Sequence, residues 1–171
     1  LEKLKATPRL SRTPVALPSM PQLRTIRRII GEYTLTNADI YRHFDDSVTA
    51  LCDSERRDSL YEIPYRSLYD HRFPNLIAAG RNIASAGYLW DVTRVIPPAI
   101  VTGQAAGTAA AMAVCAGCSI PALPVEKLQQ ELARQQVLIH FEDMWIPRER
   151  TVGEYSPASQ SDPDRQKESA R

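Results

Sequence analysis

The chain has 171 residues, and its 21 basic and 20 acidic residues leave a formal net charge of +1 at neutral pH. This balance excludes a protein that binds nucleic acid through bulk charge, while the length is sufficient for one domain with its own hydrophobic core. Three cysteines are too few for a disulfide framework, and residues 1–21 lack the continuous apolar stretch of a signal peptide. We therefore expect a cytoplasmic protein.

The amino-terminal third of the chain predicts an extended segment followed by a strand and a turn. Residues 1–21 contain four of the 13 prolines, which favours an extended surface segment. Residues 23–36 are expected to include a half-buried strand, because apolar and polar side chains alternate from Gly31 to Thr36. The sequence TNAD that starts at Thr36 has the pattern of a capping box. Residues 45–58 are predicted to be a loop or a strand with solvent on one side.

The centre of the chain predicts an edge segment and then a buried strand. Residues 61–68 are expected to be extended, and Pro64 excludes them from a central position in a sheet. Residues 75–79 form a compact apolar run, which is typical of a strand buried on both faces. This strand would end at Gly80 and Arg81, where the backbone can approach a ligand closely.

An uncharged helix is predicted over residues 104–116, and because it is apolar on every side we expect it to be internal. It opens at the sequence GQAAG, where free N–H groups would face an electron-rich atom. Gly103, Gly107 and Ala111 recur every four residues and form a smooth stripe. The helix lies in a charge-free stretch, residues 95–125, but two adjacent prolines and several polar residues there argue against a membrane span.

The carboxy-terminal part predicts one amphipathic helix, one strand and a tail. The helix is expected to begin at Pro124 and to place Leu128 and Leu132 on one face. Residues 137–141 are predicted to be a final strand. Residues 147–171 have few large apolar side chains and are expected to be disordered.

Five blocks of the sequence are informative together because of their order and spacing. They are RTIRRIIGEYTLTNAD, YEIPYRSL, PNLIAAGRNIAS, TRVIPPAIVTGQAAGTAAAMA and LPVEKLQQEL. In this order the blocks resemble the carboxy-terminal part of the FAD-dependent oxidoreductase family, the broad group that contains flavoproteins related to the flavin subunit of heterodisulfide reductase.

This resemblance implies an α/β fold in which a partial Rossmann-like FAD-binding domain follows the end of a substrate domain. Residues 22–60 would end the substrate domain, and residues 61–146 would supply the carboxy-terminal strands and helix of the FAD-binding domain. The Pro-rich residues 1–21 and the tail, residues 147–171, would lie outside both domains.

The resemblance also implies where FAD would lie. The strand that ends at Gly80 would pass beside the cofactor, and the positive end of the helix would stabilise the negative charge of a reduced flavin. The residues expected to bind the cofactor are Gly80, Arg81, Arg94, Thr102, Gly103, Gln104, Ala105 and Ala106. The alternatives are a tightly packed core helix for the glycines and surface ion pairs for Arg81 and Arg94.

The sequence assigns neither catalytic residues nor a metal site. Cys115 and Cys118 have the CxxC spacing, but a second pair is missing. His43, His71 and His140 are scattered along the chain and suggest no constellation.

The implied FAD site is incomplete, because the sequence contains no glycine-rich phosphate turn and no acidic residue placed to hold the ribose. Our first interpretation is therefore a carboxy-terminal fragment of a FAD-dependent oxidoreductase that acts on a small-molecule substrate. A missing amino-terminal half or a partner chain would complete the site, and this chain alone would be inactive. The alternative is a non-catalytic remnant or a structural partner subunit of a separate flavin-binding chain.

Overall fold

The computed structural model describes residues 24–56 and 58–149 of the chain. The Pro-rich residues 1–21 and the greater part of the expected tail, residues 150–171, lie outside this part, so both remain predictions. Within the described residues, helices combine with a two-stranded antiparallel sheet, so the fold is mixed α/β.

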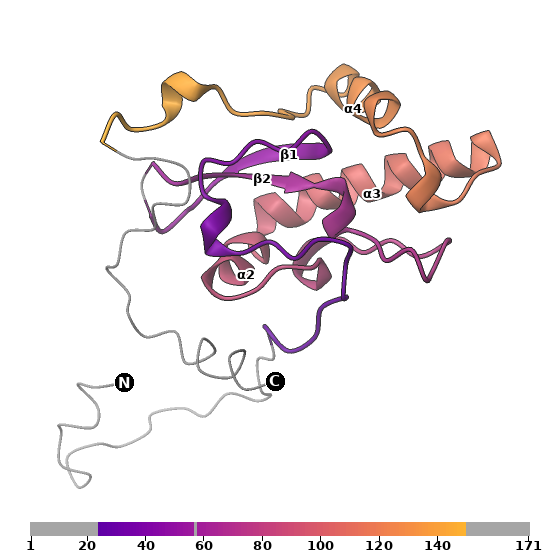
Figure 1. The fold of residues 1–171 in the computed structure, drawn as a ribbon, viewed down its shortest axis with the longest axis horizontal. Coiled ribbons are helices and arrows are strands. Elements are labelled where there is room, and N and C mark those ends of the chain that lie inside the picture. Colours follow the sequence, from indigo (N-terminus) through magenta and orange to yellow (C-terminus); the bar gives the residue numbers. More distant parts are fainter. Residues whose placement is uncertain (1–23, 57, 150–171) are drawn as a thin grey trace, which may run out of the picture.

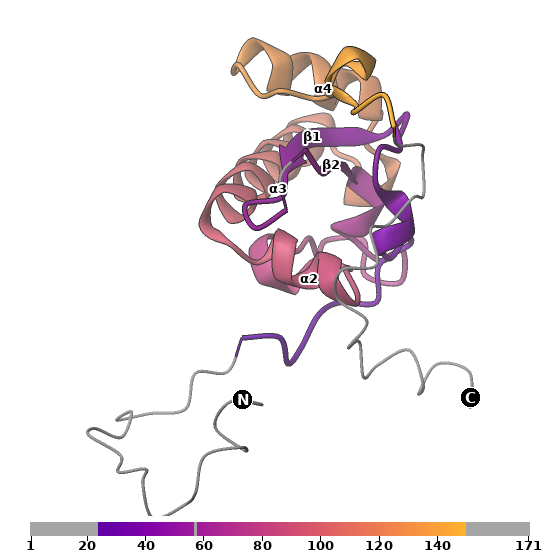
Figure 2. The ribbon, with the colours of Figure 1, turned by 90° about the vertical axis from the view of Figure 1, so that its left-hand side faces the viewer.

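The sheet lies between two short helices, and a long helix runs beside it. Strands β1 (Ser47–Cys52) and β2 (Leu60–Pro64) form the sheet. Figures 1 and 2 show helix α4 (Val125–Arg134) above the sheet and helix α2 (Tyr88–Thr93) below it, with the long helix α3 (Ile96–Ala116) alongside. Short 3-10 helices occur at Asn37–Asp39, Tyr65–Ser67, Gly80–Asn82, Ile120–Ala122 and Asp143–Trp145.

The sheet is anchored in the core because β1 buries its first three residues and β2 buries its last four. Val48 in β1 and Ile63 in β2 are fully buried, and Tyr61 pairs in register with Leu51. Pro64 ends β2, and a sheet of two strands has no central position from which a proline would be excluded. Of the two alternatives for residues 45–58, a loop or a strand with solvent on one side, the strand is present at Ser47–Cys52, but its first three residues are all buried.

A single cluster of buried apolar side chains connects the described elements. It includes Leu35 near the start, Leu89 in α2, and Leu128 and Leu132 in α4. The last two confirm the predicted inner face of α4. Residues from both sides of the expected boundary between residues 60 and 61 share this core, and the division into two domains stays a prediction.

The predicted strand over residues 23–36 is wrong for the residues that the structure describes. Residues 24–36 contain two bends and no strand; they make one parallel bridge between Leu35 and Ser85 and scattered backbone hydrogen bonds, such as that from the Ile29 N–H to the Asn82 carbonyl. The capping box is confirmed, because the Thr36 N–H donates a hydrogen bond to Asp39 Oδ2 at 2.8 Å. Alternation of side chains alone could not supply the partner strand that a sheet requires.

Two further predicted strands are also wrong. Residues 75–79 form no strand; Leu76 has 49% of its surface exposed, and the segment makes one isolated bridge. Residues 137–141 form no strand either, although the Leu138 carbonyl accepts a hydrogen bond from the Ala50 N–H at 2.7 Å. Both segments are apolar enough for a strand, but neither makes the series of backbone hydrogen bonds that a sheet requires.

Helix α3 begins at Ile96, eight residues before the predicted start at residue 104. Pro97 and Pro98 occupy its first turn, where the helix does not use backbone N–H groups and proline is tolerated. The helix ends at Ala116, and the following Gly117 caps it with a φ of 63°, the left-handed conformation favoured by glycine. With 21 residues, α3 is long and apolar enough to cross a membrane, a test that core helices of soluble proteins also pass.

The prediction that α3 is internal is wrong, because only one face of it is buried. Thr102, Ala105 and Ala109 are fully buried, whereas Ile96 and Val114 have 75% and 81% of their surface exposed. The exposed small and apolar residues repeat at helical spacing along the opposite face. We call this face the outer stripe; it consists of Ile96, Ile100, Gly103, Gly107, Ala111 and Val114.

Candidate functional site

Gly80 and Thr102, two of the residues expected to bind the cofactor, lie in direct contact. The Gly80 N–H donates to Thr102 Oγ1 at 2.9 Å, and the same hydroxyl donates to the Pro98 carbonyl at 2.6 Å. Gly80 has a φ of +64°, and a Cβ added there would lie 3.5 Å from the Ala99 Cβ. A glycine therefore lets the chain turn closely over the first turns of α3.

Gly103 and Gln104 do not form the start of a helix, which corrects the sequence analysis. Both lie about two turns inside α3, where backbone N–H groups bond to carbonyl oxygens four residues earlier. The true amino end is at Ile96, and Pro97 and Pro98 have no N–H to offer an anion. The positive pole that was expected at Gly103 is therefore absent. The helix start was predicted too late in the chain, because Pro97 and Pro98 look like a break although they lie in the first turn of the helix.

Gly103 instead presents open backbone on the outer stripe. A Cβ added at Gly103 or at Gly107 would meet no other atom within 4 Å. Ala105 and Ala106 face the opposite way and are buried in the core. Of the predicted GQAAG motif, the glycines are thus available to an incoming group, while the alanines serve packing.

Gln104 connects α3 to the end of α4. Its side-chain Nε2 donates to Gln135 Oε1 at 2.9 Å, and Gln135 directly follows α4. Gln104 is partly buried by this contact. Its amide is therefore engaged with Gln135, and its expected role toward the flavin stays a prediction.

The two arginines of the predicted site have different surroundings. Arg94 pairs with Asp91 on the surface of α2, with 2.6 Å between Nε and Oδ1. The Arg81 carbonyl accepts a hydrogen bond from Trp90 Nε1 at 2.8 Å. For Arg94 this contact favours the alternative role, a surface ion pair instead of a contact with the cofactor. Such pairs stabilise a protein by at most about 1 kcal/mol.

An open groove lies between α3 and α4, next to the outer stripe. Its volume is about 620 Å³. Gly107 and Ala111 line it on the α3 side, and Lys127, Glu131 and Arg134 on the α4 side. Glu131 and Arg134 pair with each other at 2.7 Å. The groove thus has a small-residue wall and a charged wall.

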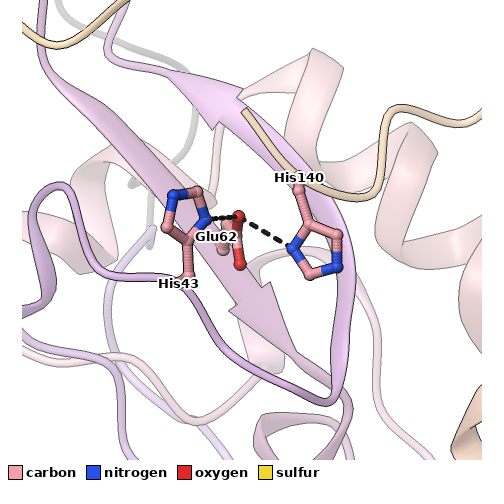
Figure 3. Close-up of side chains that lie close together, drawn as sticks. All are labelled: His43, Glu62 and His140. Carbon is pink, nitrogen blue, oxygen red and sulfur yellow. Dashed lines mark hydrogen bonds and ion pairs between the residues drawn. The ribbon is translucent and has the colours of Figure 1, made fainter. Parts of the chain in front are cut away.

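A second constellation, which the sequence analysis missed, surrounds the fully buried Glu62 of β2. His43 Nδ1 lies 2.6 Å and His140 Nδ1 lies 3.0 Å from the same oxygen, Glu62 Oε1. Figure 3 shows the two imidazoles on either side of this carboxylate. The Phe44 N–H donates to Glu62 Oε2 at 2.8 Å. The only sequence signal was a glutamate between apolar residues of a strand.

The pKa of His43 reflects competing influences. Burial is the largest single influence and lowers this pKa, but the hydrogen bonds to Asp143 and Glu62 together outweigh it, so the pKa is raised above its ordinary value. His43 Nε2 lies 2.9 Å from Asp143 Oδ1, and its ring packs against Phe141 with 4.3 Å between centroids. The ring is therefore held from three sides.

A third cluster, formed by Glu32, Asp70 and His71, lies at the surface. His71 donates its backbone N–H to Glu32, and its Nδ1 also contacts that carboxylate. Both Asp70 oxygens accept hydrogen bonds from Arg72 at 2.9 and 3.0 Å, which lowers the pKa of Asp70 to about 2. Asp70 is therefore already committed to a guanidinium.

Comparison with known proteins gives one match. The family model described as FAD dependent oxidoreductase matches residues 3–132, which is more than half of the chain. Neither the curated proteins nor the solved structures that were searched contain a match to this chain.

Proposed function

Because this chain belongs to the FAD dependent oxidoreductase family, we propose that it forms one wall of a flavin redox site. In this proposal it is the carboxy-terminal part of a Rossmann-like FAD-binding domain, joined to the end of a substrate domain, in a flavoprotein related to the flavin subunit of heterodisulfide reductase. The complete enzyme would oxidise or reduce a small-molecule substrate in the cytoplasm.

The observation that carries the proposal is the outer stripe of α3 beside the Gly80 turn. Exposed apolar surface of this extent at helical spacing marks a contact face. The two glycines in it leave backbone open to close approach. Thr102 holds the Gly80 turn at one end of this face. We infer that the flavin and the remaining part of its domain cover the outer stripe.

The described residues supply contacts for only one side of a cofactor. Neither α3 nor α4 offers a phosphate cradle, because α3 has two prolines in its first turn and α4 carries Glu126 in its first turn. The sequence contains no G-x-G-x-x-G pattern. FAD would supply the two-electron chemistry, while this chain would contribute packing, exclusion of water and fixed backbone at Gly80 and Gly103. The pyrophosphate contacts belong to the rest of the domain.

The test measures flavin content in the protein that unites this chain with the glycine-rich half of the FAD-binding domain. We expect Gly103→Leu to lose the flavin absorbance per mole of protein, because the new side chain fills the space of the cofactor or its neighbour. Ala116→Leu is the matched control, since it enlarges another exposed small residue of α3 and should keep the flavin.

Full flavin content in Gly103→Leu would contradict the proposal. A complex that assembles normally but binds no FAD, even when FAD is added in excess, would instead support the alternative. In that case the chain is a structural partner or a non-catalytic remnant.

A further inference from the structure

Three segments far apart in the sequence bring their ligand-type atoms together at Glu62. His43 lies in the turn before β1, Glu62 in β2, and His140 in the extended segment after α4. Their nearest nitrogen and oxygen atoms all lie within 4.8 Å of one another. Figure 3 shows both imidazole rings turned toward one carboxylate oxygen. This convergence is independent of the proposed flavin site, which lies on α3.

The buried carboxylate needs positive charge close to it. Glu62 is fully buried, and a carboxylate in that position is costly unless charge and hydrogen bonds compensate it. Among the residues that the structure describes, neither lysine nor arginine forms an ion pair with Glu62. Its partners there are two imidazoles and one backbone N–H. A cation shared by the three side chains would provide the compensation.

Asp143 orients His43 for this role. Its carboxylate lies 2.9 Å from His43 Nε2, which holds the ring with Nδ1 facing Glu62 and available as a ligand. The 2.6 Å separation between Nδ1 and Glu62 Oε1 places a proton between the two atoms, and a metal ion would take the place of that proton. A carboxylate behind a histidine is the usual outer arrangement of metal-ligating histidines.

We propose that His43, Glu62 and His140 bind a divalent transition metal of the zinc type. Two imidazole nitrogens and one carboxylate oxygen form a recognised three-ligand zinc set, with water in the fourth position. The side chains of His43 and His140 are 41% and 47% exposed, so the open position faces solvent.

The geometry requires only small movements. Ligand atoms around a tetrahedral zinc ion lie about 3.4 Å apart, since each bond is about 2.1 Å long. The two nitrogens now lie 2.6 and 3.0 Å from Glu62 Oε1, so each half-exposed ring has to move outward by less than about 1 Å. The bound ion would fasten the segment around His140 to β2.

The surface cluster around Glu32 provides an internal contrast. It contains one histidine and two carboxylates instead of two histidines and one carboxylate, and Asp70 is paired with Arg72 through both oxygens. A metal ion there would have to displace the guanidinium. We therefore assign the metal to the Glu62 cluster, and His71→Ala becomes a matched control.

The experiment titrates the whole chain with Zn²⁺ by calorimetry and with Co²⁺ by visible absorption. One ion per chain should bind, and His140→Ala should weaken binding at least about tenfold because a direct ligand is lost. Asp143→Asn should weaken it about tenfold through His43. Circular dichroism confirms that the variants are folded, and Asp143 is exposed enough for the second variant to keep its fold.

Two controls separate this site from other metal ligands. The double variant Cys115→Ser, Cys118→Ser and the variant His71→Ala should bind Zn²⁺ as tightly as the unchanged chain. The proposal is overturned if His140→Ala and Asp143→Asn bind with unchanged affinity, or if the double cysteine variant removes the binding. Failure of the unchanged chain to bind Zn²⁺ more tightly than His140→Ala would overturn it as well.

Discussion

Strand β2 and helix α3 reverse the expected relation between polarity and burial. Glu62 of β2 is charged and fully buried, whereas Ile96, Ile100 and Val114 of α3 are apolar and largely exposed. The difference lies in the partners. Glu62 is surrounded by groups that complement its charge, and nothing in the described part of the chain covers the outer stripe. A charged residue that is buried, or a large apolar residue that is exposed, is therefore the best indicator of an interaction.

The largest effect on stability is expected for a substitution at Glu62. We expect Glu62→Ala to lower the free energy of unfolding by about 3–5 kcal/mol, because it removes the partner of two imidazoles and leaves the Phe44 N–H buried and unpaired. Urea denaturation in the presence of a chelator measures this loss without a metal contribution.

Glu55→Ala is the control, because Glu55 is exposed and its loss should change stability by less than about 0.5 kcal/mol. Equal stability of the two variants would mean that the Glu62 contacts do not compensate its burial.

A second prediction compares the two faces of α3. Ala109 is fully buried, so Ala109→Leu should overfill the core and destabilise the chain by about 1–3 kcal/mol. Thermal unfolding followed by circular dichroism measures it. If Ala109→Leu were neutral, the assignment of the inner face would be wrong.

A third prediction concerns the contact between α3 and the Gly80 turn. Thr102→Val keeps the shape of the side chain but removes the acceptor of the Gly80 N–H, which should cost about 1–2 kcal/mol. Thr102→Ser keeps the hydroxyl and should retain most of the stability. Equal losses in both variants, measured by urea denaturation, would argue that the methyl group rather than the hydrogen bond matters.

The smallest effect has the opposite sign. Gly103→Ala should stabilise this chain alone by about 0.4–1 kcal/mol, because alanine favours the helix and an added Cβ meets no neighbour. Destabilisation in thermal unfolding would show that the outer stripe is already covered in the isolated chain.

Features set by neighbouring residues could be predicted from the sequence. The capping box at Thr36 and the inner face of α4 at Leu128 and Leu132 are local patterns, and both are confirmed. The start of α3 was missed because Pro97 and Pro98 look like a break, although proline fits the first turn of a helix.

Features that depend on distant partners could not be predicted. The segments 75–79 and 137–141 have the composition of strands, but a strand exists only where another backbone pairs with it. The Glu62 cluster joins residues 19 and 78 positions apart, so no spacing indicates it. The hydrogen bond between Gly80 and Thr102 was likewise not predicted, and the role of both residues toward FAD stays a prediction from the family resemblance.

The most direct test of the central claim measures how accessible the outer stripe is to a thiol reagent. Cys52, Cys115 and Cys118 are first replaced by serine, and a single cysteine is then introduced as Gly107→Cys or, for control, as Ala116→Cys. Joined to the glycine-rich half of the FAD-binding domain and loaded with FAD, Gly107→Cys should react at least about tenfold more slowly than in this chain alone, because a covered site must open before it reacts. The control should react at the same rate in both forms. Equal rates for Gly107→Cys in the two forms would contradict the account.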